Sequence, residues 1–164
     1  MTRDNARELA VQIVYGAPLA GVGCGEFVER FFAEEHYPTM DSEDEIYKTP
    51  DSQSMDYIRS TVNGVFDNLE AIDGMIGRFS RGWSVSRISG TARAVLRVAV
   101  YEILYTDVPV AAAINSAVEI DKGYDEPDTV AFVNGVLGSV SRREQNSEDA
   151  NPTANPESGT ETGI

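Results

Sequence analysis

The sequence predicts an all-α domain of five to seven helices, and three observations lead to this expectation. Apolar residues recur at intervals of three and four along most of the chain, which is the period of one helix face. No segment keeps the strict alternation of apolar and polar residues that is typical of a β-strand. The chain has 164 residues, of which 41% are hydrophobic, so it is long enough to bury one core.

The first two expected helices lie before residue 34. Apolar residues from Ala6 to Ala17 follow the helical period and predict a helix over about 3–19. Three glycines between 21 and 25 end it, and three phenylalanines between 27 and 32 indicate a short second helix. The segment 34–54 is acidic, contains two prolines and shows no sustained period. It is therefore expected to be a solvated loop, inserted into the domain.

The next segment predicts one long helix over about 55–79. Eight apolar residues there are spaced alternately three and four apart, and Ser54 is the expected N-cap. Three glycines interrupt it, at 64, 74 and 77. Each costs up to about 1 kcal/mol relative to Ala, so they indicate either close contacts with other helices or an early end.

Three further features complete the helical prediction. Ser89 is the expected N-cap of a central helix, because two adjacent apolar positions recur from 92 to 104. Pro109 and Gly123 are suited to begin and end the following helix, and a last helix follows Asp128. The segment 144–164 has nothing to bury and is expected to be a disordered acidic tail, which leaves 1–143 as the folded domain.

The net charge of −14 is unevenly distributed along the chain. The segments 34–51 and 144–164 carry net charges of −6 and −5, which leaves about −3 for all other residues. Within that nearly neutral body, 78–97 contains five arginines and no acid. The same segment contains Phe79 and Trp83, so it offers charge for phosphates and flat groups for bases, as nucleic acid binding requires.

Catalytic and metal sites are not expected. The single histidine, His36, lies in the acidic loop, which is not expected to hold a general base in a fixed position. The single cysteine, Cys24, forms no internal disulfide and no zinc set. The glycines at 21–25 lack the lysine of a phosphate-binding loop, and the acids at 41–45 lack the spacing of a calcium loop. No apolar run is long enough to span a membrane and no signal peptide is evident, so a cytoplasmic, non-enzymatic protein without a cofactor is expected.

Four sequence motifs, in order along the chain, closely resemble the NusB family of bacterial transcription antitermination factors. They are ARELAVQ at 6–12 followed by Tyr15, VLRVAVYEIL at 95–104 followed by Val108 and Pro109, AINSAVE at 113–119, and FVNGVLG at 132–138. The resemblance covers about 1–20 and 55–143. It implies two small helical bundles packed crosswise.

The resemblance also implies a function and its partners. NusB proteins pair with NusE, a small-subunit ribosomal protein, and the pair holds boxA RNA against elongating RNA polymerase during ribosomal RNA synthesis. The RNA-binding positions that it implies are Arg3, Arg7, Gln12, Tyr15, Phe132 and Asn134. The NusE-binding positions that it implies are Tyr101, Glu102, Glu119, Asp125, Glu126 and Asp128, whose acids would steer a basic protein. Arg3 and Arg7 are expected to lie opposite the apolar stripe of the first helix.

Two departures from the family pattern keep other functions open. The start of the chain is less rich in arginine than is usual in the family, and Ala131 stands where a basic residue is common before the FVNG motif. The first alternative is therefore a protein–protein adaptor, or a self-associating homodimer, with weak or lost RNA binding. The second is a fragment of an RNA cytosine methyltransferase, which the absence of a cofactor domain after Arg143 disfavours.

Overall fold

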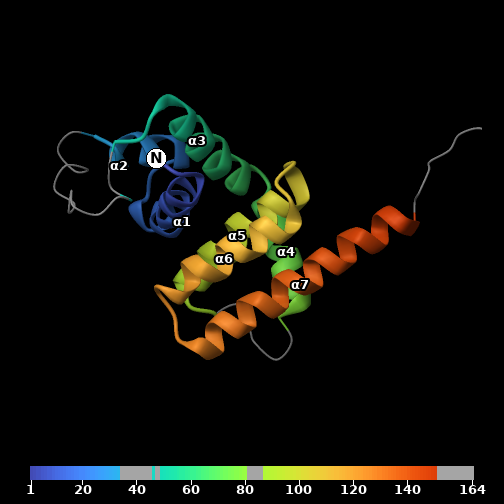
Figure 1. Ribbon diagram of the computed structural model, residues 1–164. Coiled ribbons are helices and arrows are strands. Elements are labelled where there is room, and N and C mark those ends of the chain that lie inside the picture. The colour runs from blue at the N-terminus through green and yellow to red at the C-terminus, as the bar shows by residue number, and fades with distance from the viewer. Residues whose placement is uncertain (34–45, 47–48, 81–86, 151–164) are drawn as a thin grey trace, which may run out of the picture.

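The computed structural model describes residues 1–33, 46, 49–80 and 87–150, and in these ranges the chain forms seven helices and no strand. The helices are shown in Figure 1 and are α1 (Arg3–Ala20), α2 (Cys24–Phe31), α3 (Ser52–Asp67), α4 (Leu69–Phe79), α5 (Gly90–Tyr105), α6 (Val110–Lys122) and α7 (Pro127–Ala150). The predicted all-α class is confirmed. None of the described helices alone has both the length and the apolar character needed to cross a membrane.

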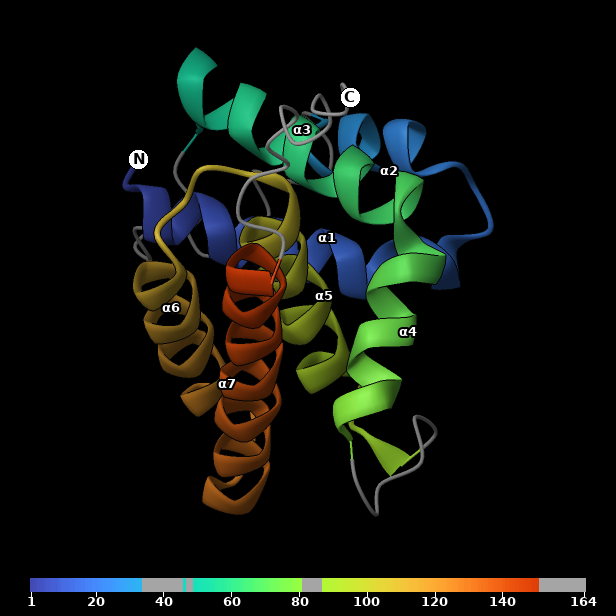
Figure 2. The ribbon, with the colours of Figure 1, turned by 90° about the vertical axis from the view of Figure 1, so that its right-hand side faces the viewer.

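The helices form two groups that cross each other. Helices α1 to α3 pack together, and α4 to α7 form a second group whose axes run across α1 (Figure 2). Helix α5 lies at the junction, where it packs against α1, α3, α4, α6 and α7. Its two-position apolar stripe is buried, as expected for the central helix, with Leu96 and Val100 fully enclosed.

Helix ends follow local signals in the sequence. The Ser89 side chain accepts a hydrogen bond from the Ala92 amide at 3.0 Å, which confirms it as the N-cap of α5. Gly21 ends α1 with a φ of 72°, a conformation that glycine adopts without steric cost. Pro109 precedes α6 and Gly123 ends it, as predicted.

The prediction of one helix over 55–79 is wrong, because the chain breaks at Asn68 into α3 and α4. The Asn68 side chain donates a hydrogen bond to the Gly64 carbonyl at 2.8 Å, and its backbone amide donates to the same oxygen at 3.2 Å. The amide side chain thus competes with regular helical bonding at this point. The first of the two helices also starts earlier than predicted, since Asp51 and not Ser54 caps it, accepting from the Ser54 amide at 2.8 Å.

Two segments predicted to be irregular are partly ordered. In the expected loop 34–54, α3 begins at Ser52 and Ile46 is 6% exposed within the core, so the segment is not wholly solvated. In the expected disordered tail 144–164, α7 continues to Ala150. The remaining residues of these segments, 34–45, 47–48 and 151–164, lie outside the described residues, as do 81–86.

Gly64 marks a close helix crossing, which is one of the two roles expected for the glycines of 55–79. A Cβ atom at this position would lie 2.3 Å from ring carbons of Tyr101 on α5. At Gly74 and Gly77 no atom of the described residues lies within 4 Å of such a Cβ, so within that part of the chain they make no comparable contact.

Candidate nucleic-acid interface

Helix α7 directs Phe132 and Asn134 into two different grooves. Phe132 lines a groove against α4, whereas Asn134 lines a groove against α6. Residues two apart on a helix do not share a face, which explains the separation. The two positions that the FVNG motif placed together on an RNA surface therefore meet different surroundings.

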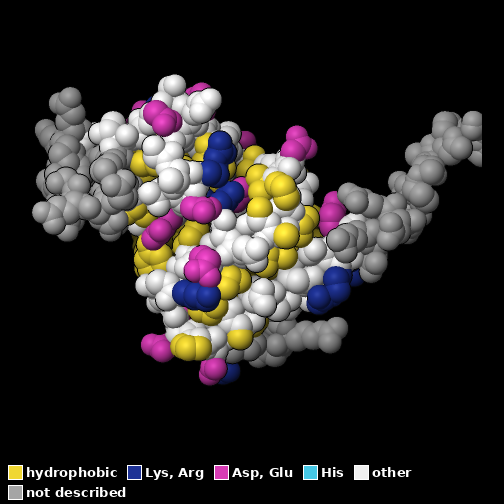
Figure 3. Space-filling view, viewed as in Figure 1, with side chains coloured by type: hydrophobic (Ala, Val, Ile, Leu, Met, Phe, Trp, Pro, Cys, Tyr) yellow, Lys and Arg dark blue, Asp and Glu magenta, His cyan; other side chains and the backbone are white. Residues whose placement is uncertain are grey.

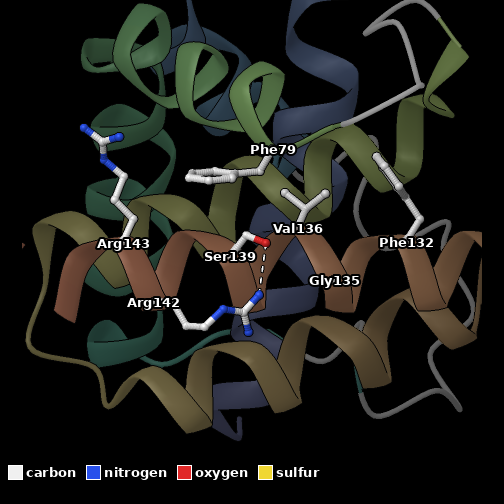
Figure 4. Close-up of a pocket in the computed structure, with 7 residues that line it drawn as sticks. All are labelled: Phe79, Phe132, Gly135, Val136, Ser139, Arg142 and Arg143. Atoms are coloured by element: carbon white, nitrogen blue, oxygen red, sulfur yellow. Dashed lines mark hydrogen bonds between the residues drawn. The ribbon is translucent and has the colours of Figure 1, made fainter. Parts of the chain in front are cut away.

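The groove at Phe132, called here the aromatic groove, has a volume of about 560 Å³. Its lining residues are Phe79, Phe132, Gly135, Val136, Ser139, Arg142 and Arg143 (Figure 4). In Figure 4 the Phe79 ring lies across α7, with Arg143 toward one end of the groove and Phe132 toward the other. Two rings and two cations therefore line one concave surface, and none of its described lining residues is acidic.

The aromatic groove has the chemistry of a single-stranded nucleic acid site. Both phenylalanines are only partly buried, and an aromatic ring is the kind of group on which a base can stack. Arg142 donates a hydrogen bond to Ser139 Oγ at 3.2 Å and is itself exposed, which leaves further N–H donors for phosphate. Gly135 adds no side chain, and no atom of the described residues lies within 4 Å of where its Cβ would be, which leaves room for a base to approach the helix.

Among the described residues of the predicted basic segment 78–97, the groove is lined by Phe79. The guanidinium of Arg78 lies 5.8 Å from the centre of the Phe79 ring. Arg97, by contrast, is paired with Asp73 at 2.9 Å, and Arg93 donates to the Ile88 carbonyl at 3.1 Å. Arg87 is exposed, while Arg81 and Trp83 lie outside the described residues.

Arg7 does not lie on an exposed face, and the expectation that it lies opposite the apolar stripe is wrong. It is 5% exposed and donates from Nε and Nη2 to the Glu102 carboxylate, at 2.6 and 3.1 Å. Its Nη1 also donates to Asp4 at 2.7 Å and to Ser116 at 2.9 Å. Burial is the largest single effect on the pKa of Arg7 and lowers it. The hydrogen bond to Glu102, together with the charges of the neighbouring acidic groups, outweighs burial, so the pKa is raised.

Glu102 is likewise misplaced as a partner-binding residue. Its side chain is 1% exposed and is held by Arg7, so it joins α5 to α1 and is not available to another protein. Tyr101 is half-buried beside Gly64 and stacks on Tyr105, with ring centres 5.8 Å apart. These two positions therefore stabilise contacts between helices in this chain.

The other predicted residues of α1 lie at three separate places. Arg3 is exposed, with its guanidinium 4.1 Å from the centre of the Tyr57 ring. Gln12 donates to the Tyr124 hydroxyl at 3.1 Å, which links α1 to the turn between α6 and α7. Tyr15 is 48% exposed and lines a groove with Leu19, which is 76% exposed.

The Tyr15 groove differs in chemistry from the aromatic groove. Pro18, Leu69 and Ala94 add apolar surface to it, and Arg93 and Arg97 add polar edges. Contiguous exposed apolar surface of this kind is typical of sites that bind other proteins. The Tyr15 ring is also packed over Gly90, where a Cβ would lie 2.7 Å from a ring carbon.

The acidic positions predicted to face a partner surround a groove between α6 and α7, called here the acidic groove. Glu119, Asp125 and Glu126 line it together with Asn134. Asp128, two residues after Glu126, is exposed to solvent. Glu119 is paired with Lys122 at 2.7 Å, and Asp125 accepts from Ser89 Oγ at 3.0 Å. Figure 3 shows acidic and basic side chains interspersed on the face that includes α6 and α7, so no large field of one sign covers it.

Sequence reasoning missed Arg142 and Arg143 as site residues. The apolar period of the last helix ends at Val140, so no periodic signal marked the two arginines that follow it in the predicted domain 1–143. The signal that favours a longer helix is the absence of glycine and proline from 139 to 150. Among the residues that the structure describes, no group of three or more His, Cys, Asp or Glu is arranged to hold a metal ion.

Comparisons with known proteins point to one family. The family model described as the NusB family matches residues 4–142. The transcription antitermination protein NusB of Syntrophotalea carbinolica is 39% identical over 149 residues, covering 85% of this chain and 92% of that protein. The NusB protein of Acetivibrio thermocellus is 35% identical over 158 residues, covering 96% of this chain and 100% of its own length.

Solved structures show the same fold. T. maritima NusB has a TM-score of 0.72 and 25% identity, covering 90% of this chain and 98% of its own. A crystal structure of antitermination factors NusB and NusE in complex with dsRNA contains a chain with a TM-score of 0.70 and 23% identity, covering 86% of this chain and 96% of that one. From the family model and the curated relatives together, the chain belongs to the NusB family.

Proposed function

We propose that this chain is a transcription antitermination factor that binds boxA-type single-stranded RNA through the aromatic groove. It acts with a NusE-like ribosomal protein beside elongating RNA polymerase, in ribosomal RNA synthesis in the cytoplasm, and catalyses no reaction. The observation that carries the RNA proposal is that Phe79, Phe132, Arg142 and Arg143 line one groove, with no acid among its described lining residues. Membership of a family whose curated relatives are named transcription antitermination proteins supports the role in transcription.

The aromatic and the basic residues of the groove are expected to contribute differently to RNA binding. Stacking of a base on an aromatic side chain contributes about 1–3 kcal/mol, whichever base it is. Each arginine that neutralises a phosphate adds affinity that falls as salt rises, with a slope of about −0.7 per contact on single strands. Phe79 and Phe132 are therefore expected to set the affinity, and Arg142 and Arg143 its dependence on salt.

The test is a fluorescence titration with boxA-type RNA, with and without NusE, at about 50 and about 200 mM salt. Phe132→Ala is expected to weaken binding about 5- to 150-fold at both salt concentrations, because the stacking energy is lost. The double change of Arg142 and Arg143 to Ala should make the salt slope less steep by about 1.4, the contribution of two phosphate contacts. Arg59→Ala is the matched control, since Arg59 is exposed on α3 and paired with Glu29 at 2.9 Å.

A specific outcome would favour the adaptor instead. If RNA gives no signal with or without NusE at the lower salt, or if Phe132→Ala changes affinity less than twofold in a folded protein, the aromatic groove is not an RNA site. The buried Arg7 and the alanine at 131 would then be part of a protein–protein adaptor or a homodimer.

Two surfaces are candidates for the protein partner, and one pair of variants separates them. Reversing Glu126 and Asp128 to Lys is expected to slow association with NusE at low salt and less at high salt, if the acidic groove steers that basic protein. Leu19→Asp should weaken the complex mainly through faster dissociation if the exposed Tyr15 groove is the contact. Unchanged association rates for the first variant would assign the partner to the Tyr15 groove.

A further inference from the structure

The end of α6 contains an acidic side chain in an unusual position. Asp121 is 0% exposed, and neither of its carboxylate oxygens has a hydrogen-bond partner in the part of the chain that the structure describes. An ionised carboxylate in such a place is strongly unfavourable, because it has left water without gaining a donor. Whether Asp121 carries a proton therefore depends on the groups that lie beside it.

The neighbouring group is a second carboxyl group, that of Asp125. The Asp125 amide donates to the Asp121 carbonyl at 2.9 Å, so the two residues lie one helical turn apart and on the same side. Two ionised carboxylates are both acceptors and cannot bond to each other. They can do so when one of them carries a proton.

Asp125 is in turn attached to the start of α5. Ser89 Oγ donates to the two Asp125 oxygens, at 3.0 and 3.2 Å, and accepts from the Ala92 amide at 3.0 Å. The positive end of the α5 dipole stabilises a negative charge at this point. Asp125 thus already accepts a hydrogen bond from α5, whereas Asp121 accepts none from a donor among the described residues, so Asp121 is the member of the pair that holds the proton.

The charged groups on the surrounding elements are either paired with other residues or acidic. On α6, Lys122 is paired with Glu119 at 2.7 Å, and on α1, Glu8 accepts from the Tyr124 hydroxyl at 2.9 Å. Arg93 on α5 donates to the Ile88 carbonyl. The remaining charged residues nearby in sequence, which are Arg87, Glu126 and Asp128, are exposed to solvent.

We infer that Asp121 and Asp125 share one proton and act as a proton-sensitive latch between the turn after α6 and the N-terminus of α5. With the proton present, the chain of hydrogen bonds from Asp121 through Asp125 and Ser89 to the Ala92 amide is complete. When the proton leaves to solvent, two carboxylates repel each other in a buried place and the latch opens. The turn leads directly into α7, so its attachment positions the first turn of that helix.

The pH range follows from the same surroundings. Burial, and the carboxyl group of Asp125, raise the pKa of Asp121 to about 7. Because this pKa is higher in the folded state than in the unfolded state, the stabilisation is complete at low pH and is lost as pH rises from about 4 to about 7. The latch is thus expected to be closed below neutral pH and open above it.

The test compares the wild-type protein with Asp121→Asn, which keeps a neutral side chain at every pH. NMR titration of the wild-type Asp121 carboxyl carbon should show a transition near pH 7. The melting temperature of Asp121→Asn relative to wild type should rise from about pH 5 to about pH 7 and then level off. Exchange of the Ala92 amide in the wild type, corrected for the intrinsic effect of pH, should be faster at about pH 8 than at about pH 6.

Ser89→Ala is the matched variant for the connection to α5. It should leave the Asp121 titration in place but remove the pH dependence of Ala92 exchange. Titration of Asp121 in the ordinary aspartate range, near pH 4, would overturn the inference, as would a melting difference that is constant from about pH 5 to about pH 8. If adding Mg²⁺ at about pH 8 restored the protection of Ala92, the pair would be a cation site and not a proton latch.

Discussion

Replacing Arg7 by Ala should destabilise this protein strongly, because it leaves a buried charge without its partner. Glu102 is 1% exposed and its carboxylate is bonded to Arg7 Nε and Nη2, at 2.6 and 3.1 Å. Breaking a buried ion pair from one side costs about 3–5 kcal/mol. Since domains of this size are stable by only about 5–15 kcal/mol, the loss should be a large share of the total. Urea unfolding followed by circular dichroism measures it.

A double-mutant cycle with Glu102→Gln shows whether the pair is the cause. The double variant buries no unpaired charge, so it should be more stable than the sum of the two single changes predicts, with a coupling of at least about 1 kcal/mol. Arg3→Ala is the control, because Arg3 is exposed on the same helix. The reasoning is refuted if Arg7→Ala costs less than about 1 kcal/mol or if the two changes simply add. If Arg7→Ala loses RNA binding, its free energy of unfolding must be compared with that of the wild type, because a destabilised fold would weaken binding indirectly.

The remaining predictions concern helix contacts and a helix cap. Gly64→Ala should lower the free energy of unfolding by about 1–3 kcal/mol, because its Cβ would lie 2.3 Å from the Tyr101 ring and the two helices must separate. Gly74→Ala, where the Cβ would meet nothing within 4 Å, should instead stabilise α4 by about 0.5–1 kcal/mol, and urea unfolding of both variants decides the comparison. Hydrogen bonds from the backbone amide and the side chain of Ser54 lower the pKa of Asp51. The stability from this cap is therefore present above about pH 4 and lost below it, and Asp51→Ala should show a smaller loss of melting temperature on acidification than wild type.

The helices were predictable wherever a regular apolar period coincides with a buried face. The break at Asn68 was not, because the apolar spacing continues in phase from Met55 to Phe79 across it. The break depends on one local hydrogen bond, from the Asn68 side chain to Gly64, which the period does not encode. The last turns of α7 were not predicted, because here the apolar period is missing although the helix continues. They have no apolar stripe, so periodicity gave no signal where helix propensity was the relevant property.

The candidate site was predictable by residue type more than by position. The sequence indicated that Phe79, in a segment with arginines, and Phe132, in the FVNG motif, have the chemistry of an RNA surface, but only the fold brings them into one groove. The burial of Arg7 depends on Glu102, which is 95 residues away in the chain. One local signal was present: Val11, one turn after Arg7, is apolar and buried, so the buried part of α1 is wider than a single stripe.

The way in which arginines are used determines what kind of RNA-binding protein this chain can be. Arg7, Arg30, Arg59 and Arg97 are engaged in ion pairs with acids of the same chain. The aromatic groove itself has two lining arginines, so it supplies about two phosphate contacts, and a salt slope near −1.4 on single-stranded RNA follows from about −0.7 per contact. Most of the binding energy must then come from stacking on Phe79 and Phe132, which salt screens little. A steep salt dependence of the chain alone would show that cations outside this groove hold the RNA, whereas a steep dependence that appears only with NusE would assign them to the partner.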